Sequence, residues 1–181
     1  MRLQLLIIGF ILGVVGFSTS LAQAQIKPGK EKLLVQLDPA YKWKSSTEKS
    51  EFNSIRKTTF KIQGKQSIEY PIQLLELTTI DKRYYTIKAR AAAMDKLKYY
   101  QSQCQEIVLD LRQQGVTENG SFVIYILQAP IDVECMDHVF LGLAVDGPTA
   151  FHGIEIKIPK EKANAALLEQ WVALLSEYKI Q

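Results

Sequence analysis

The sequence predicts an α+β domain in which a mostly antiparallel sheet packs against two main helices, a layered α/β sandwich. Short segments in which apolar and polar residues alternate indicate strands. Two longer segments with apolar residues every three to four positions indicate amphipathic helices. Because the links between successive strands are short, we expect antiparallel pairing, with the apolar stripes of the helices buried on the sheet.

The first predicted strands are short and mixed in polarity. Lys32–Leu37 is an apolar strand candidate. Tyr41 and Trp43 then alternate with lysines, which is typical of a half-buried strand. The polar stretch Ser45–Ser54 indicates a loop.

A hairpin is predicted next. Phe60 and Ile62 alternate with polar residues up to a turn at Gln63–Gln66, and the alternation resumes over Ile68–Leu74. Pro71 lacks an amide donor, so we expect an edge or a bulge there. The apolar phase shifts at the end of this strand, which also predicts a bulge.

The period of the apolar residues changes after the following turn. Asp81–Arg83 predicts a turn into a strand over Tyr84–Ala89. Beyond it, the spacing predicts an amphipathic helix over Ala91–Gln114 that ends at Gly115. The apolar stripe of this helix comprises Ala93, Leu97, Tyr100, Cys104, Ile107 or Val108, and Leu111.

Three strands and a closing helix complete the predicted domain. Phe122–Leu127 and Val139–Val145 are nearly continuous apolar runs, as expected for central strands covered on both faces. Ile154–Ile158 alternates, and the turn signal Asp146–Pro148 predicts that the last two strands form a hairpin. A final helix is predicted to open at Pro159. Its apolar stripe comprises Ala163, Leu167, Trp171, Leu174 and Tyr178.

The N-terminal segment has the layout of a secretory signal peptide. Arg2 gives a positive start, an apolar run extends over Leu5–Phe17, and Ala22-Gln23-Ala24 forms a small-x-small cleavage site. The run is short of the roughly 20 residues that a membrane-spanning helix needs; an uncleaved membrane anchor is the alternative interpretation. We therefore expect a signal peptide over 1–24, a flexible tail over 25–31 and one globular domain over 32–181, in a secreted or periplasmic mature protein without a membrane span.

Composition narrows the class of protein. The chain is 47% hydrophobic and 23% charged, as in an ordinary globular domain. Its formal net charge of +3 comes from charges mixed along the sequence, which argues against nucleic acid as a partner. Cys104 and Cys135 are the two cysteines. In an exported protein an isolated pair is most simply a disulfide, with two free thiols or a redox-active pair as alternatives.

The order of elements resembles that of the PsbP/Mog1-like family. The resemblance rests on the aromatic strand Tyr41-Lys42-Trp43, several strands, the helix Ala91–Gln114, a strand meander and a closing helix. It covers most of the chain after the signal peptide, as element order only. Members of this family are generally noncatalytic accessory or partner-binding domains, so the resemblance implies binding. It carries no functional residue over to this sequence.

Few residues form a constellation that suits catalysis. With Val145 facing His152 across the predicted hairpin, His138 lies near the other end, about 20 Å away, too far to share a metal ion. Glu134 and Asp137 stand next to His138 in sequence, and the three could hold a cation or form a solvated acidic loop. The sequence contains no G-x-S-x-G elbow, no H-E-x-x-H helix and no glycine-rich phosphate loop.

Aromatic residues offer candidate binding contacts. Tyr99 lies beside the apolar stripe of the first predicted helix, so we expect it to be exposed. Phe151 and His152 end a loop predicted over Ala144–His152. We therefore predict these three residues as binding residues, with ordinary packing as the alternative. Asn119-Gly120-Ser121 fits the N-glycosylation pattern and also an ordinary turn.

Two classes of function stay open. We expect an exported noncatalytic binding or accessory protein that uses no cofactor and has a protein, peptide or glycan as partner. The alternative is a small exported hydrolase or metal-dependent enzyme that uses Glu134, Asp137 and His138. A deep polar pocket holding a histidine would favour the enzyme, and a shallow surface with exposed aromatic residues would favour binding.

Processing of the N-terminus gives the first testable prediction. Because the small-x-small site ends at Ala24, we expect the exported protein to begin at Gln25. Edman sequencing or intact mass measurement of protein from the exported fraction reads this end. Recovery of chains that still carry Met1–Ala24 would contradict cleavage and favour the anchor.

Overall fold

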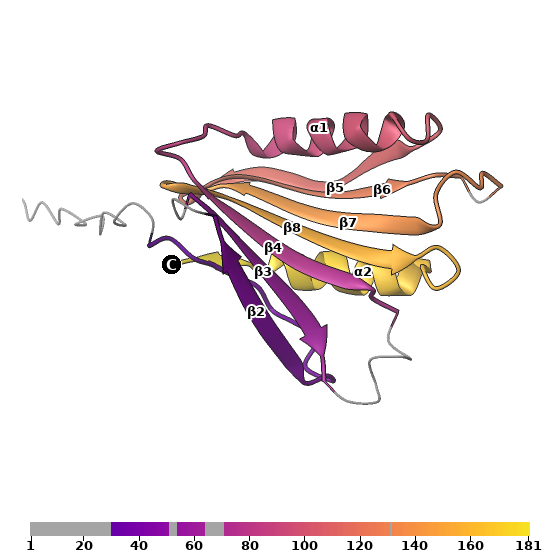
Figure 1. Ribbon diagram of the computed structural model, residues 1–181, viewed down its shortest axis with the longest axis horizontal. Coiled ribbons are helices and arrows are strands. Elements are labelled where there is room, and N and C mark those ends of the chain that lie inside the picture. Colours follow the sequence, from indigo (N-terminus) through magenta and orange to yellow (C-terminus); the bar gives the residue numbers. More distant parts are fainter. Residues whose placement is uncertain (1–29, 51–53, 64–70, 131) are drawn as a thin grey trace, which may run out of the picture.

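The computed structural model describes residues 30–50, 54–63, 71–130 and 132–181. In these ranges one antiparallel sheet has the strand order β2-β3-β4-β8-β7-β6-β5, and β1 pairs with β9 separately. Figure 1 shows α1 and α2 on opposite sides of the large sheet. The elements are β1 (Leu33–Leu34), β2 (Trp43–Lys49), β3 (Ile55–Ile62), β4 (Leu74–Asp81), α1 (Ala89–Gln101), β5 (Val108–Thr117), β6 (Gly120–Gln128), β7 (His138–Asp146), β8 (Ala150–Pro159), α2 (Ala165–Ser176) and β9 (Lys179–Ile180).

The predicted α+β class with a large antiparallel sheet is confirmed. The predicted signal peptide and most of the predicted tail lie outside the described residues. Within the described ranges, neither helix has the length and apolarity required to cross a membrane.

The centre of the sheet is buried on both faces. Along β6, Val123 and Tyr125 pack on the α1 side, whereas Ile124 and Ile126 pack on the α2 side. Every residue of β7 is buried as well. The prediction of central strands is confirmed, because a strand covered on both faces has no solvent-facing side that would call for polar residues.

The β7–β8 hairpin has the predicted register. Val145 pairs with His152, and His138 pairs with Pro159. The two histidines therefore lie near opposite ends of the hairpin, about 20 Å apart at roughly 3.4 Å per residue. The two side chains are therefore too far apart to share a metal ion.

The first predicted helix is too long. α1 ends at Gln101, and β5 replaces the helical continuation to Gln114. The helix-like apolar spacing of this segment comes from a turn over 102–107 and from a bulge between Leu111 and Gln113. Its conformation is a strand because it pairs with β6. Cys104 consequently lies in the turn after α1 and not on a helical stripe.

The polar segment predicted as a loop is partly an edge strand. β2 pairs with β3 in continuous register, so the loop prediction from Ser45 is wrong as far as Lys49. Polar side chains occur here because β2 lies at the edge of the sheet and most of its residues are exposed. The hydroxyls of Thr47 and Thr58 form a hydrogen bond of 2.9 Å across the pair.

β4 begins at Leu74, and the described residues 71–73 before it are not in a strand, so the strand predicted over Ile68–Leu74 is wrong for these residues. Residues 64–70, which include most of the predicted turn, lie outside the described part of the chain. Pro71 precedes the strand, and β4 pairs with β8 without the bulge predicted there.

The strand predicted over Tyr84–Ala89 is wrong, because this segment is a turn and a connection into α1. Lys82 and Lys88 both form ion pairs with the carboxylate of Asp146 at the end of β7, which hold the connection in place. Tyr84 and Tyr85 remain about half exposed, at 55% and 50%.

The last helix begins later than predicted. Pro159 ends β8, and α2 starts after Asn164, whose side-chain oxygen accepts a backbone hydrogen bond of 3.0 Å from the first turn. Trp171 in the second half of α2 is fully buried, and its ring meets that of Trp43 edge to face with centroids 6.3 Å apart. The residues at the start of α2 are mostly exposed.

The buried position of Trp171 gives a stability prediction. Trp171→Ala removes the largest side chain of the core cluster on the α2 side, so we expect a loss of about 3–5 kcal/mol in the free energy of unfolding. Denaturant melts measure this loss. The control Val116→Ala removes methyl groups from a residue that is 84% exposed and should change stability by less than about 0.5 kcal/mol. A loss below about 1 kcal/mol for Trp171→Ala would show that α2 contributes little to the core.

Candidate functional site

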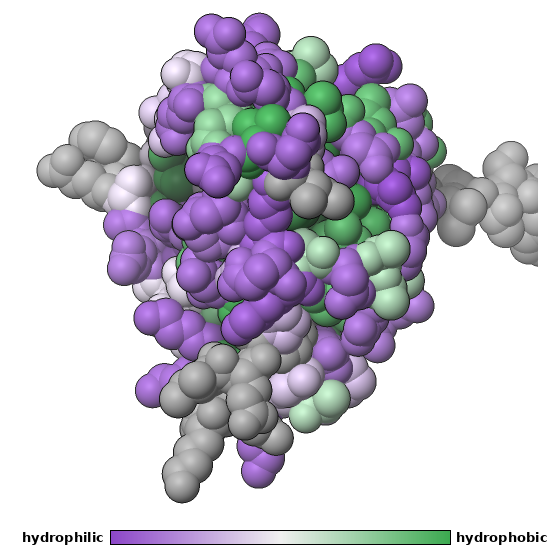
Figure 2. Space-filling model, turned by 90° about the vertical axis from the view of Figure 1, so that its right-hand side faces the viewer, coloured by the Kyte–Doolittle hydropathy of each residue, from purple (hydrophilic) through white to green (hydrophobic). Residues whose placement is uncertain are grey.

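A cavity of about 690 Å³, here called the α2 cleft, lies between the first half of α2 and the sheet. Figure 2 views the molecule from the end that carries the β6–β7 and β8–α2 connections, where hydrophobic residues show between hydrophilic ones. The cleft has an apolar floor and a charged rim. The floor comprises Ile126, Ala129, Val139, Ala163 and Leu168, and the rim comprises Asp110, Arg112, Asp137, Lys160, Glu161 and Glu169.

The rim of the α2 cleft carries more negative than positive charge. Arg112 bridges two of its carboxylates, contacting Asp110 at 2.8 Å and also Glu169. The Lys160 ammonium donates to the backbone carbonyls of Pro130 at 2.6 Å and Val133 at 2.8 Å. Four carboxylates and two cations leave the rim with a formal charge of −2.

Only part of the predicted acidic and histidine cluster comes together. Asp137 contacts Nδ1 of His138, and this hydrogen bond lowers the pKa of the Asp137 carboxyl. The described residues bring three metal-ligating atoms within 4.8 Å of one another at Cys104, Glu106 and Cys135. Glu134 therefore does not join Asp137 and His138 in a three-ligand cluster.

Tyr99 is exposed, as predicted from its place beside the helical stripe. Its side chain on α1 is 58% exposed, and its ring lies 5.1 Å from that of Tyr100. Tyr100 instead stacks on Phe140 of β7, with ring centroids 4.3 Å apart. Tyr99 is thus available for a contact on the α1 side, on the face of the sheet opposite the α2 cleft.

The predicted loop around Phe151 is wrong. β7 extends to Asp146 and β8 begins at Ala150, so Phe151 lies within a strand and is 6% exposed. It lines a cavity of about 230 Å³ under α1, together with Ala92 and Lys96 of that helix. A ligand that contacts Phe151 must therefore enter this cavity.

His152 is fully buried in a polar network, which the sequence did not predict. Its Nε2 lies 3.0 Å from Oε1 of Glu31, and its Nδ1 lies 3.0 Å from Oγ1 of Thr79. Thr149 donates to the other carboxylate oxygen of Glu31 from its backbone N–H at 2.5 Å and from its hydroxyl at 2.7 Å. Glu31 and His152 are both 0% exposed, and the hydrogen bonds of the network satisfy their buried polar atoms.

Glu31 was predicted to end a flexible tail, and this is wrong. Burial works to raise the pKa of its carboxyl, but the hydrogen bonds from His152 and Thr149 outweigh burial and lower the pKa. Gly147 makes room for the carboxylate, because a Cβ on this residue would collide with Oε1 of Glu31. The network therefore fixes the start of the described chain on the β7–β8 turn.

This network gives a prediction for stability against pH. Glu31→Gln keeps the shape but removes the charge, so we expect a loss of about 2–4 kcal/mol at pH 7. Because the pKa of folded Glu31 lies below the usual 4.5, its stabilising effect is complete above that pH and is lost as the pH falls through the lowered value. The difference in the free energy of unfolding between wild type and variant should therefore become smaller as the pH falls below 4.5.

Denaturant melts at a series of pH values between 7 and 3 measure the difference. Glu134→Gln is the matched control, since Glu134 is exposed, and it should change stability by less than about 0.5 kcal/mol. A difference for Glu31→Gln that stays constant over this pH range would contradict a role for the ionised carboxylate.

Comparison with known proteins identifies the fold. No protein family matches the sequence, and no curated protein matches it either. The solution structure of cyanobacterial PsbP (CyanoP) from Synechocystis sp. PCC 6803 is similar, with a TM-score of 0.50 at 10% sequence identity. The match covers 90% of this chain and 98% of that one. The element order, the antiparallel sheet and this similarity together show that the chain has a PsbP-like fold.

Proposed function

We propose that this protein is an exported, noncatalytic binding protein whose α2 cleft takes a ligand with an apolar part and a cationic group. A short basic and apolar segment of a partner protein fits this description. The observation that carries the proposal is the combination of an apolar floor and an excess of carboxylates in one cavity of about 690 Å³.

The floor of the cleft supports an apolar contact. Leu168 of α2, Val139 of β7 and Ala129 all line the floor of the cavity with apolar groups. Each apolar side chain that a ligand buries here would contribute roughly 25 cal/mol per Å² of surface removed from water. Burial against these residues supplies affinity that does not depend on salt.

The rim supports selection by charge. Glu161 and Asp137 add negative charge to that of Asp110 and Glu169, of which the single charge of Arg112 offsets only one. These carboxylates line the rim of the cleft, so they would attract a cation, and salt would shorten the range of this attraction by screening. Association should therefore be faster at low ionic strength.

The placement of the histidines supports binding without catalysis. His152 has both ring nitrogens engaged inside the Glu31 network. His138 extends from β7 next to Val139, so its side chain points to the opposite face of the strand from the cleft floor. Neither imidazole is placed to act as a general base on a ligand in the cleft.

A pair of labelled peptides tests the proposal. We expect a short peptide that alternates Leu and Arg to bind, and the same peptide with Glu in place of Arg to bind at least about tenfold more weakly. Fluorescence anisotropy measures both affinities. Equal binding of the two peptides, or binding of neither, would contradict the proposal.

Two substitutions on α2 locate the binding site. Ala165→Trp places a large ring at a cleft residue and should weaken binding of the Arg peptide at least about tenfold, because it fills the cavity. Ala166→Trp is the matched control: Ala166 is also exposed but does not line the cleft, so binding should stay within about twofold. Equal affinities of these two variants would overturn the assignment of the cleft.

Two charge reversals and one aromatic truncation complete the test. Glu161→Lys should weaken binding about fivefold at low salt, whereas Glu177→Lys at the far end of the helix should not. Tyr99→Ala should leave this affinity unchanged. A loss confined to Tyr99→Ala would instead place the partner on α1, at the aromatic contact predicted from the sequence.

A further inference from the structure

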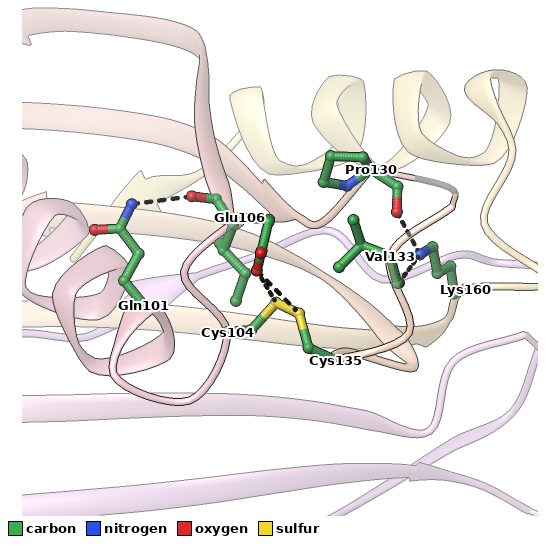
Figure 3. Close-up of a disulfide and its surroundings, with 8 residues drawn as sticks. Gln101, Cys104, Glu106, Pro130, Val133, Cys135 and Lys160 are labelled. Atoms are coloured by element: carbon green, nitrogen blue, oxygen red, sulfur yellow. Dashed lines mark hydrogen bonds between the residues drawn. A yellow bond between two sulfur atoms is a disulfide. The ribbon is translucent and has the colours of Figure 1, made fainter.

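A carboxylate lies against the disulfide between Cys104 and Cys135. Oε2 of Glu106 is 3.8 Å from Sγ of Cys104 and 3.7 Å from Sγ of Cys135. Figure 3 shows this carboxylate pointing at both sulfur atoms. Cys104 is buried, whereas Glu106 and Cys135 are exposed, so solvent reaches the group from one side.

We propose that reduction of this disulfide creates a binding site for a borderline-soft divalent cation, Zn²⁺, with Cys104, Cys135 and Glu106 as its protein ligands. Two thiolates and one carboxylate are ligands that Zn²⁺ prefers. Three protein ligands leave a fourth tetrahedral position for water, as in open zinc sites. None of these three ligands lines the α2 cleft.

The spacing of the ligand atoms supports the proposal. Zinc binds sulfur at about 2.3 Å and carboxylate oxygen at about 2.0–2.2 Å, so two tetrahedral ligands lie about 3.6–3.8 Å apart. The Glu106 carboxylate already stands at this distance from each sulfur. Once the disulfide is reduced, the main adjustment needed is separation of the two sulfur atoms.

Hydrogen bonds outside the disulfide hold the two cysteine segments. The backbone N–H of Cys104 donates to the carbonyl of Tyr100 at 2.9 Å, and the side chain of Gln101 donates to the carbonyl of Ile107 at 3.0 Å. In the segment that carries Cys135, the ammonium of Lys160 binds the carbonyls before the cysteine. The ligand set therefore stays assembled when the sulfur–sulfur bond is broken.

The electrostatics of the reduced state favour a bound cation. The carboxylate of Glu106 and two thiolates would together carry three negative charges, and a divalent cation bound among them offsets their mutual repulsion. With a phosphine as reductant, the phosphine and one water become phosphine oxide while the disulfide takes up two protons and two electrons to give two thiols. Zn²⁺ then displaces the two thiol protons.

Cobalt serves as the spectroscopic probe for this site. Reduced wild-type protein should bind one Co²⁺ per chain with a thiolate-to-metal charge-transfer band and the intense visible bands of tetrahedral cobalt, and Zn²⁺ should displace it. Oxidised protein should give no such bands. Absence of the charge-transfer band in the reduced protein, or its equal presence in the oxidised protein, would overturn the proposal.

Substitutions identify the ligands. Cys135→Ser should abolish most of the charge-transfer intensity, and Glu106→Gln should weaken Zn²⁺ binding at least about tenfold while keeping the thiolate band. The matched control is Glu134→Gln, an exposed glutamate on the segment that carries Cys135, which should bind like wild type. If Glu106→Gln binds as tightly as this control, the carboxylate is not a ligand and the proposal fails.

Near-ultraviolet circular dichroism follows the fold in the same samples. If reduction alone loosens the fold, Zn²⁺ should restore the native signal, because metal binding then contributes to folding. Loss of the signal without restoration by Zn²⁺ would contradict a preformed ligand set.

Discussion

Burial of the central strands on both faces is the constraint on which the rest of the fold depends. β6, β7 and β8 each place apolar side chains above and below the sheet, so both faces need a cover. α1 supplies one cover through Ala89 and Ala93, and the second half of α2 supplies the other through Trp171 and Leu175. Trp43 at the start of β2 still contacts Trp171 of α2, but the rest of this edge strand is exposed, which is why polar residues predominate there. The first half of α2 extends past the tightly packed region, and the α2 cleft occupies the space that remains.

Sequence patterns predicted those elements whose periodicity reflects burial. The β7–β8 register was predictable because Ile154–Ile158 alternates on one covered face and the turn signal sits at one place. The pattern failed for β5, where a turn and a bulge produced a helical spacing by chance, and for β2, where exposure removed any pattern. In both segments the deciding contacts come from a neighbouring strand, and these contacts are not visible in local sequence.

The candidate site was less predictable for the same physical reason. The exposure of Tyr99 followed from its place relative to one helical stripe, which is local information. The burial of His152 depends on Glu31, which lies far away in the sequence and reaches it only because the start of the domain folds back over β8. The α2 cleft likewise combines residues from three strands and a helix, and no spacing in the sequence marks it. The disulfide was predictable because an isolated cysteine pair behind a predicted signal peptide is most simply a disulfide. The position of Glu106 beside it was not predictable, because nothing in the sequence distinguishes this glutamate from the others.

The pairing of β1 with β9 has a consequence for the order of folding. The backbone of Lys32 exchanges two hydrogen bonds with Gln181, at 2.7 and 2.9 Å, so one of the first described segments is completed only by the last. This contact has the largest sequence separation in the sheet pairings, and its closure entropy can be offset only after the intervening sheet has formed. During synthesis, the ribosome must therefore release the C-terminal residues before the N-terminal strand can find its partner. Until then the backbone of Lys32 lacks its partner, so the pair of β1 and β9 closes after the large sheet has formed.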